Sequence, residues 1–318
     1  MSKPILVGYD PRGQDHAPVL FGVAMGRVTG APVIVAAVQG GDPPVMPISA
    51  GQTLPYGVVT REEDLLDDCT QELEHLESEI RAPGVRVECR RLTSSSAARA
   101  LHDEAHRIEA GMLVVGSSRH GKVGRVLLGS TADRLMHGAP CPVAVVPNGW
   151  TDRGELRTVA VGFVDTKEGH EALRAASQLA QLRGATLRVV TAVRVGVNVY
   201  GEAETPVEAR PDGDLEGDYL RRVEQHVREA LGRLPGDVGI EVTTLVGDAA
   251  DALIRVSQDV DLLVIGSRGY GPLRAVAVGG VSRRVADEAH CPVIVLPRGV
   301  EASLDALLAD APGAAAAT

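Results

Sequence analysis

The feature that most constrains this chain is an internal repeat with a spacing of 150 residues. Residues 113–147 read LVVGSSRHGKVGRVLLGSTADRLMHGAPCPVAVVP, and residues 263–297 read LVIGSRGYGPLRAVAVGGVSRRVADEAHCPVIVLP. Three landmarks of the first segment recur at this spacing in the second: Gly116 with Gly266, Gly129 with Gly279, and Cys141 with Cys291. A constant spacing across a loop, a helix and a strand indicates that a whole structural unit is duplicated.

Short apolar runs alternate with amphipathic stretches in both halves of the chain, which predicts strands alternating with helices. This alternation is typical of α/β domains, so we expect two tandem doubly wound parallel five-stranded sheets with helices on both faces. We predict a first domain at 1–148, a linker at 149–157, a second domain at 158–298 and an alanine-rich tail at 299–318. The tail is expected to be disordered, although its SLDALLAD stretch could form a short docking helix.

Helix boundaries are marked by residues with special backbone or capping roles. Gly30 and Gly184 follow predicted helices at 17–28 and 170–182 and are expected to end them. Serines at 94–96 offer N-caps for the next helix. We also expect a helix at 61–81, and long loops at 39–60 and 194–214.

Composition excludes several classes of function. A net charge of −10 argues against a nucleic-acid-binding protein, which needs a basic surface. No apolar run is long enough to cross a bilayer and no targeting segment is visible, so we expect a cytoplasmic protein that does not bind membranes. The four cysteines have no metal-binding spacing, and Cys141 and Cys291 are expected to be buried packing residues beside His137 and His290.

The glycine spacing connects the chain with a known family. Gly266-x-x-Gly269, followed after nine residues by Gly279, resembles the signature G-x-x-G-x9-G-(S/T) of the universal stress protein family. The closing runs CPVAVVP and CPVIVLP strengthen the likeness, which extends from Lys3 to Pro297 and is that of a tandem member. The resemblance implies the strand order 3-2-1-4-5 in each half and an intramolecular pseudo-dimer of the two halves. It leaves open a homodimer of the tandem chain and an unidentified protein partner.

The resemblance also implies a ligand, an adenine nucleotide such as ATP with or without Mg²⁺, at the carboxyl ends of the strands. Glycine allows close backbone approach, and free N–H groups at a helix start can bind phosphate. The implied site residues of the first half are Asp10, Val38, Val115, Gly116, Arg119, Gly129, Ser130 and Thr131. Those of the second half are Val193, Ile265, Gly266, Gly269, Gly279, Gly280 and Val281. No metal ligands are assigned.

Each half departs from the family pattern at a different place. In the first half Arg119 replaces the second glycine, and in the second half Gly280 replaces the serine or threonine. Val164 stands where the first half has Asp10, and Asp165 follows one position later, where a strand-end side chain points the other way. The first half therefore has the better adenosine end, and the second half has the better phosphate cradle.

Competing motifs are weaker. Residues 116–123 approach a P-loop, but Val123 lacks the magnesium-binding hydroxyl and Pro272 stands at the equivalent of Lys122. No G-x-S-x-G elbow or other catalytic constellation is visible, and no general base for ATP hydrolysis is evident. Three functions remain open at this stage: a nucleotide-binding regulator of the stress response, a slow ATPase, and a scaffold whose degenerate loops serve only assembly.

Overall fold

The computed structural model describes residues 3–13, 15–40, 74–75, 84–117, 126, 128–193, 215–234, 238–267, 280–297 and 307–308. The predicted helix at 61–81 lies outside these residues except for Glu74 and His75, which are helical. The predicted loop at 194–214 lies outside them as well, and so does all but the start of the loop at 39–60.

Strands and helices alternate in the first half as predicted. Its elements are β1 (Ile5–Tyr9), a 3-10 turn (Pro11–Gly13), α1 (Ala17–Thr29), β2 (Val33–Gln39), β3 (Val87–Thr93), α3 (Ala97–Arg107), β4 (Met112–Gly116), α4 (Ser130–Gly138) and β5 (Val143–Val146). The second half follows with β6 (Thr158–Gly162), α5 (Lys167–Arg183), β7 (Thr186–Val193), α6 (Leu215–Leu231), β8 (Ile240–Val246), α7 (Ala249–Val256), β9 (Leu262–Gly266), α8 (Gly280–Glu288) and β10 (Val293–Leu296).

Local residue chemistry explains where the helices begin and end. Gly30 and Gly184 adopt φ values of 71° and 61° as C-caps, a conformation that costs glycine little. Ser96 caps α3 by accepting a hydrogen bond from the Arg99 amide. The predicted start of α5 at residue 170 is wrong, because the Thr166 hydroxyl caps the helix and allows it to begin three residues earlier.

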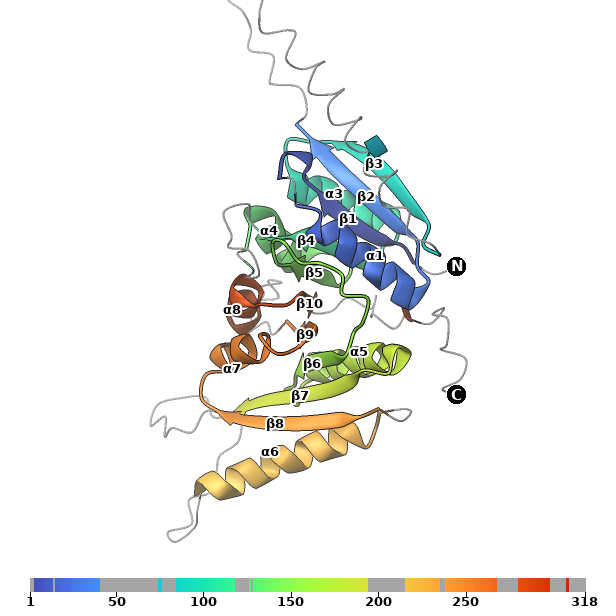
Figure 1. Ribbon diagram of the computed structural model, residues 1–318. Helices are drawn as coiled ribbons and strands as arrows, with labels where there is room; N and C mark the ends of the chain where they lie inside the picture. The colour runs from blue at the N-terminus through green and yellow to red at the C-terminus, as the bar shows by residue number, and fades with distance from the viewer. Residues whose placement is uncertain are drawn as a thin grey trace, which may run out of the picture.

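All ten strands form one sheet in the order β3-β2-β1-β4-β5-β10-β9-β6-β7-β8. The predicted order 3-2-1-4-5 is confirmed in each half, and all pairs are parallel except one. That exception is the antiparallel pair of β5 with β10, in which Ala144 lies opposite Ile294. The two predicted sheets are thus continuous, and the first half lies above the second with this pair between them (Figure 1).

The alternation of side chains along the strands divides the core into two layers. Ile5 and Val7 of β1 join one layer, under α1, α5 and α6, and Leu6 joins the other, under α3, α4, α7 and α8. Cys141 and Cys291 are both buried, as predicted. Burial raises the pKa of the Cys141 thiol to about 12, so this cysteine is a packing residue rather than a reactive thiolate.

The end of the chain returns to the first half. Leu307 and Leu308 are helical and buried, so the docking prediction is correct for these two residues of the tail. A Cβ atom placed on Gly111 would lie 2.7 Å from Leu307 Cδ1, which shows how closely the leucine sits over the start of β4. The tail therefore forms a second connection between the halves in addition to the linker.

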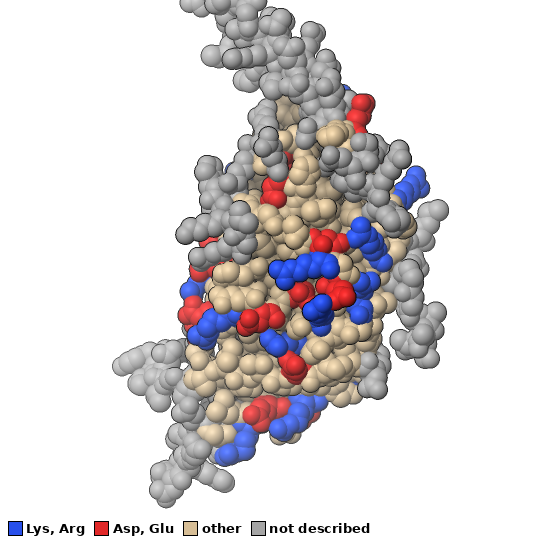
Figure 2. Space-filling view, viewed as in Figure 1, with Lys and Arg blue, Asp and Glu red and all other residues tan. Residues whose placement is uncertain are grey.

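The surface carries charges of both signs. Lysine and arginine side chains are mixed with aspartate and glutamate across the middle of the face in Figure 2, and no single basic area dominates this view. The part of the surface seen in this view is therefore mixed in charge rather than basic. In the described part of the chain, no helix combines the length and the apolar character that a membrane span requires.

The docked leucine gives a stability prediction. Leu307→Ala removes a side chain that is 0% exposed, so we expect a loss of about 2–5 kcal/mol in the free energy of unfolding, measured by denaturant titration. Val246→Ala on β8 serves as the control, because Val246 is 53% exposed and should cost less than about 1 kcal/mol. Equal stability of Leu307→Ala and the natural chain would contradict docking.

Candidate functional site

The candidate site of the first half lies where β1 and β4 end side by side. Val7 is paired with Val114, and because β2 lies on the far side of β1 the strand order reverses at this point. Ligands of open α/β sheets bind in the crevice beyond such a reversal. Asp10 follows the last residue of β1 and is exposed, Val115 is buried in β4, and Val38 is half-buried in β2.

The start of α4 faces the same edge of the sheet. Gly129 is the N-cap of α4 and offers no side-chain cap, so the first amides of the helix are not satisfied by capping. Ser130 is exposed and Thr131 is half-buried. An uncapped helix start beyond a sheet is a suitable place for an anion.

The segment before α4 is held by the other half of the molecule. The Leu128 amide donates to Asp287 Oδ1 at 2.7 Å, and the Val126 amide donates to the Ala289 carbonyl at 2.8 Å. Asp287 lies in α8, so the second half holds in place the residues that lead into α4 of the first half. Sequence reasoning missed Asp287, because no motif connects residues so far apart in the chain.

Two of the predicted glycines have a packing explanation. A Cβ atom on Gly116 would lie 2.9 Å from Pro18 Cγ, and one on Gly266 would lie 2.9 Å from the Glu168 carbonyl oxygen. Both strand ends therefore need glycine because a helix start passes over them. A Cβ atom on Gly280, in contrast, would meet no atom within 4 Å, so packing does not explain that glycine.

The second half has the equivalent elements. Val193 and Ile265 are buried at the ends of β7 and β9, whereas Gly280 and Val281 are exposed at the start of α8. The Ser282 hydroxyl of α8 donates to the Gly266 carbonyl at 3.0 Å and ties the helix to the strand end. Arg119, Gly269 and Gly279 of the predicted site lie outside the described residues, as do Lys122 and Val123 of the P-loop-like stretch.

The acidic residue of the second half is occupied by the protein itself. Asp165 Oδ1 lies 2.8 Å from His170 Nε2, and Asp165 Oδ2 lies 3.7 Å from His226 Nδ1. Val164, which stands at the position of Asp10, is 40% exposed. Asp165 is therefore both displaced by one position from the place of Asp10 and in contact with side chains of its own half.

An aromatic–histidine contact is repeated at both sites and was missed from the sequence. The rings of Tyr9 and His16 are 5.8 Å apart, and those of Phe163 and His170 are 5.3 Å apart. In each half the histidine follows the aromatic residue by seven positions, at the end of the first strand. The repeated spacing of seven residues is the sequence feature from which this contact could have been predicted. In the structure the contact holds an imidazole near the end of the first strand of each half.

A catalytic centre receives no support from the described residues. Within the ranges given above, no three histidine, cysteine, aspartate or glutamate side chains are grouped to hold a metal ion. His137 Nδ1 lies 2.6 Å from the Asp133 carbonyl oxygen of its own helix. Burial raises the pKa of Cys291 far above its usual range, so a cysteine–histidine nucleophile is not favoured there.

Comparison with known proteins agrees with this architecture. A profile of the Universal stress protein family matches residues 1–147 and 155–297. The chain belongs to the universal stress protein family. A universal stress protein of Mycobacterium tuberculosis is 32% identical over 230 residues, covering 68% of this chain and 74% of the relative. One from Mycolicibacterium smegmatis is 28% identical and covers 92% of this chain and 96% of the relative.

Solved structures of this family share the fold along nearly the whole chain. A universal stress protein from Archaeoglobus fulgidus superposes with a TM-score of 0.63 at 19% identity, covering 94% of this chain and all of that one. A putative universal stress protein from Pseudomonas aeruginosa gives a TM-score of 0.64 at 17% identity, covering 97% and 98%. The fold of the tandem universal stress protein is therefore confirmed.

The contact between Leu128 and Asp287 gives a prediction that needs no ligand. Asp287→Ala removes a charged acceptor, and losing such a hydrogen bond costs about 1.5–3 kcal/mol. We expect the Leu128 amide to exchange its hydrogen roughly tenfold faster or more, measured by hydrogen–deuterium exchange. Asp287→Asn keeps an acceptor oxygen and should retain most of the protection; equal exchange in all three chains would show that the bond does not hold this segment.

Proposed function

We propose that this universal stress protein binds an adenine nucleotide, with ATP as the expected ligand, in the crevice of the first half. The observation that carries the proposal is a difference in residue type at the end of the first strand of each half. Asp10 is exposed beyond β1, whereas the second half has Val164 at this position. The first half therefore offers a carboxylate to a ribose at this strand end, and the second half offers none at the same position.

The chemistry of the first crevice suits the parts of a nucleotide. Ribose hydroxyls can donate to the Asp10 carboxylate. The uncapped amides at the start of α4, at Ser130 and Thr131, can donate to phosphate oxygens with support from the helix dipole. The backbone near Val38 completes the site as the family resemblance implies.

Binding can act on the rest of the molecule through the contacts of the cradle. The residues just before α4 are held by Asp287 and Ala289 of the second half. A phosphate bound at Gly129 would therefore favour the arrangement of α4 and α8 in which it binds most tightly. A ligand shifts a conformational equilibrium only when it binds the two conformations with different affinities. This supports a regulatory role in which the nucleotide sets a conformational or partner-binding state during stress.

Charge placed at the two helix starts identifies the half that binds. Ser130→Glu puts a carboxylate at the first cradle and Gly280→Glu puts one at the second, and acidic residues at helix starts do not destabilise a fold. We expect Ser130→Glu to weaken ATP binding at least tenfold in calorimetry and Gly280→Glu to leave it nearly unchanged.

Gly138→Glu is the control for these variants. It adds the same charge at the far end of α4, where a Cβ atom meets nothing within 4 Å, and should not affect binding. Loss of binding in Gly280→Glu alone would move the site to the second half. Unchanged binding in both variants would exclude the two helix starts as phosphate sites.

The acidic residues give a matched pair of substitutions. Asp10→Ala should weaken ATP binding by about 1.5–3 kcal/mol, the usual value of a hydrogen bond to a charged group. Asp165→Ala should have little effect, because Val164 stands at the position of Asp10 and Asp165 lies one position beyond it, in contact with His170 and His226. Equal ATP affinities of the two variants would contradict the role of Asp10. The identity of the ligand is tested separately, by mass spectrometry of the small molecules released when freshly purified protein is denatured.

A further inference from the structure

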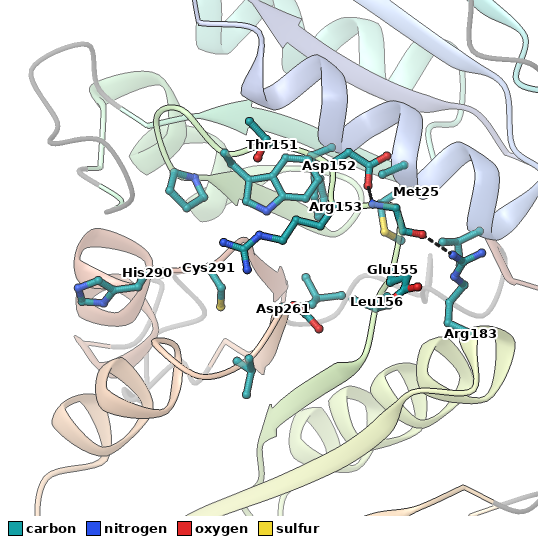
Figure 3. Close-up of a pocket in the computed structure, with 18 of the residues that line it drawn as sticks. Met25, Thr151, Asp152, Arg153, Glu155, Leu156, Arg183, Asp261, His290 and Cys291 are labelled. Carbon is teal, nitrogen blue, oxygen red and sulfur yellow. Dashed lines mark hydrogen bonds between the residues drawn. The ribbon is translucent and has the colours of Figure 1, made fainter.

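A separate cavity lies between the two halves, under the linker. Its volume is about 270 Å³, it is partly open to solvent, and it is lined by α1, by residues 147–156 and by the chain just before β9 and β10 (Figure 3). None of the predicted nucleotide-site residues that the structure describes lines it. Interfaces between domains are frequent places for ligand pockets, and this volume is at the small end of their range.

One side of this cavity is apolar and partly aromatic, and charged and polar side chains line the rest. Phe21 and Met25 of α1, with Val260 and Leu262 from around the start of β9, are buried residues that line it. Trp150 of the linker meets Phe21 edge to face, with ring centroids 5.4 Å apart. This apolar side can hold an aromatic or branched hydrocarbon group, while the charged side can hold a polar one.

The rim of the cavity is held in place by hydrogen bonds. Arg27 Nη1 and Asp152 Oδ2 form an ion pair at 2.6 Å between α1 and the linker. Arg183 donates to the Gly154 carbonyl at 3.2 Å. The Asp261 carboxylate accepts the amides of Arg157 and Thr158 at 2.8 and 2.9 Å. These contacts preform the cavity, which lowers the cost of binding a ligand.

One cation of the cavity is not engaged in this way. Figure 3 shows the Arg153 side chain extending across the cavity toward Cys291. Glu155, its near neighbour in the linker, is already paired with Arg157 at 2.6 Å. In the described part of the chain Arg153 forms no ion pair or hydrogen bond, in contrast to Arg27 and Arg183. Its planar guanidinium group can therefore accept a carboxylate with two parallel hydrogen bonds.

We propose that this cavity is a binding site for a small aromatic carboxylate. The carboxylate pairs with the Arg153 guanidinium, and the ring packs against the apolar side formed by Trp150, Phe21 and Met25. The volume of about 270 Å³ suits a one-ring acid rather than a nucleotide. This site is independent of the proposed nucleotide site, and because it joins α1 to the linker its occupancy stabilises the contact between the halves.

Trp150 is the only tryptophan of the chain, so its fluorescence reports directly on the cavity. The full chain is titrated with phenylacetate, and binding is followed by tryptophan fluorescence and by calorimetry. Phenylacetamide keeps the ring without the charge, and acetate keeps the charge without the ring. We expect saturable binding of phenylacetate, with both other compounds at least about tenfold weaker.

Arg153→Gln should reduce phenylacetate affinity to that of phenylacetamide, a loss of about tenfold or more. Arg99→Gln removes an exposed arginine of α3 that does not line the cavity and should bind phenylacetate normally. The proposal is overturned if neither fluorescence nor calorimetry detects phenylacetate binding at about 10 mM, if phenylacetamide binds equally well, or if Arg153→Gln binds like the natural chain. Circular dichroism and thermal melting of both variants confirm that they are folded.

Discussion

The antiparallel pair of β5 with β10 is the interaction on which the rest of this structure depends. Each strand is an apolar tetrapeptide, and all eight of these residues are buried. Without the pair, each half would end in a flat apolar edge with unpaired backbone groups, which is a common route to aggregation. Because the pair is antiparallel, the carboxyl ends of the strands in the two halves point to opposite edges of the sheet. The same pair brings α4 near α8 and leaves the cavity under the linker.

Duplication followed by divergence explains why the halves pair with each other. Asp133 of α4 and Arg283 of α8 occupy equivalent positions of the repeat, and Asp133 Oδ1 lies 3.0 Å from Arg283 Nε. Two first halves paired in the same way would place aspartate against aspartate, and two second halves would place arginine against arginine. Such like-charge contacts disfavour the alternative pairings more than an exposed ion pair stabilises the observed one. The hydrogen bond from the Leu128 amide to the Asp287 carboxylate also differs between the halves. The first half has His137 at the position equivalent to Asp287, so it has no carboxylate there to accept the corresponding bond.

The regularities that could be predicted from the sequence are those carried by local chemistry or by the repeat. Gly30 and Gly184 end helices because of their own backbone freedom. The pairing of the halves was implied by the family resemblance that the repeat carries, and the pair of β5 with β10 agrees with it. Contacts between distant segments leave no periodic trace, so the role of Asp287 and the burial of Leu307 against the first half needed coordinates. The early start of α5 was missed for a smaller reason, since a threonine cap three residues before a glycine resembles a loop.

The glycine motif itself carries less functional information than its spacing suggests. Gly116 and Gly266 are required by the helix starts that pass over them, so a chain that bound nothing would still need both. Gly280 is not required by packing, yet it lies in the half whose acidic residue is occupied by histidines. The argument for a nucleotide therefore passes from the glycines to the side chains that face the crevice. In a duplicated fold, packing constrains both copies equally, so a difference in residue type such as that between Asp10 and Val164 is the better guide to how the two copies differ in function.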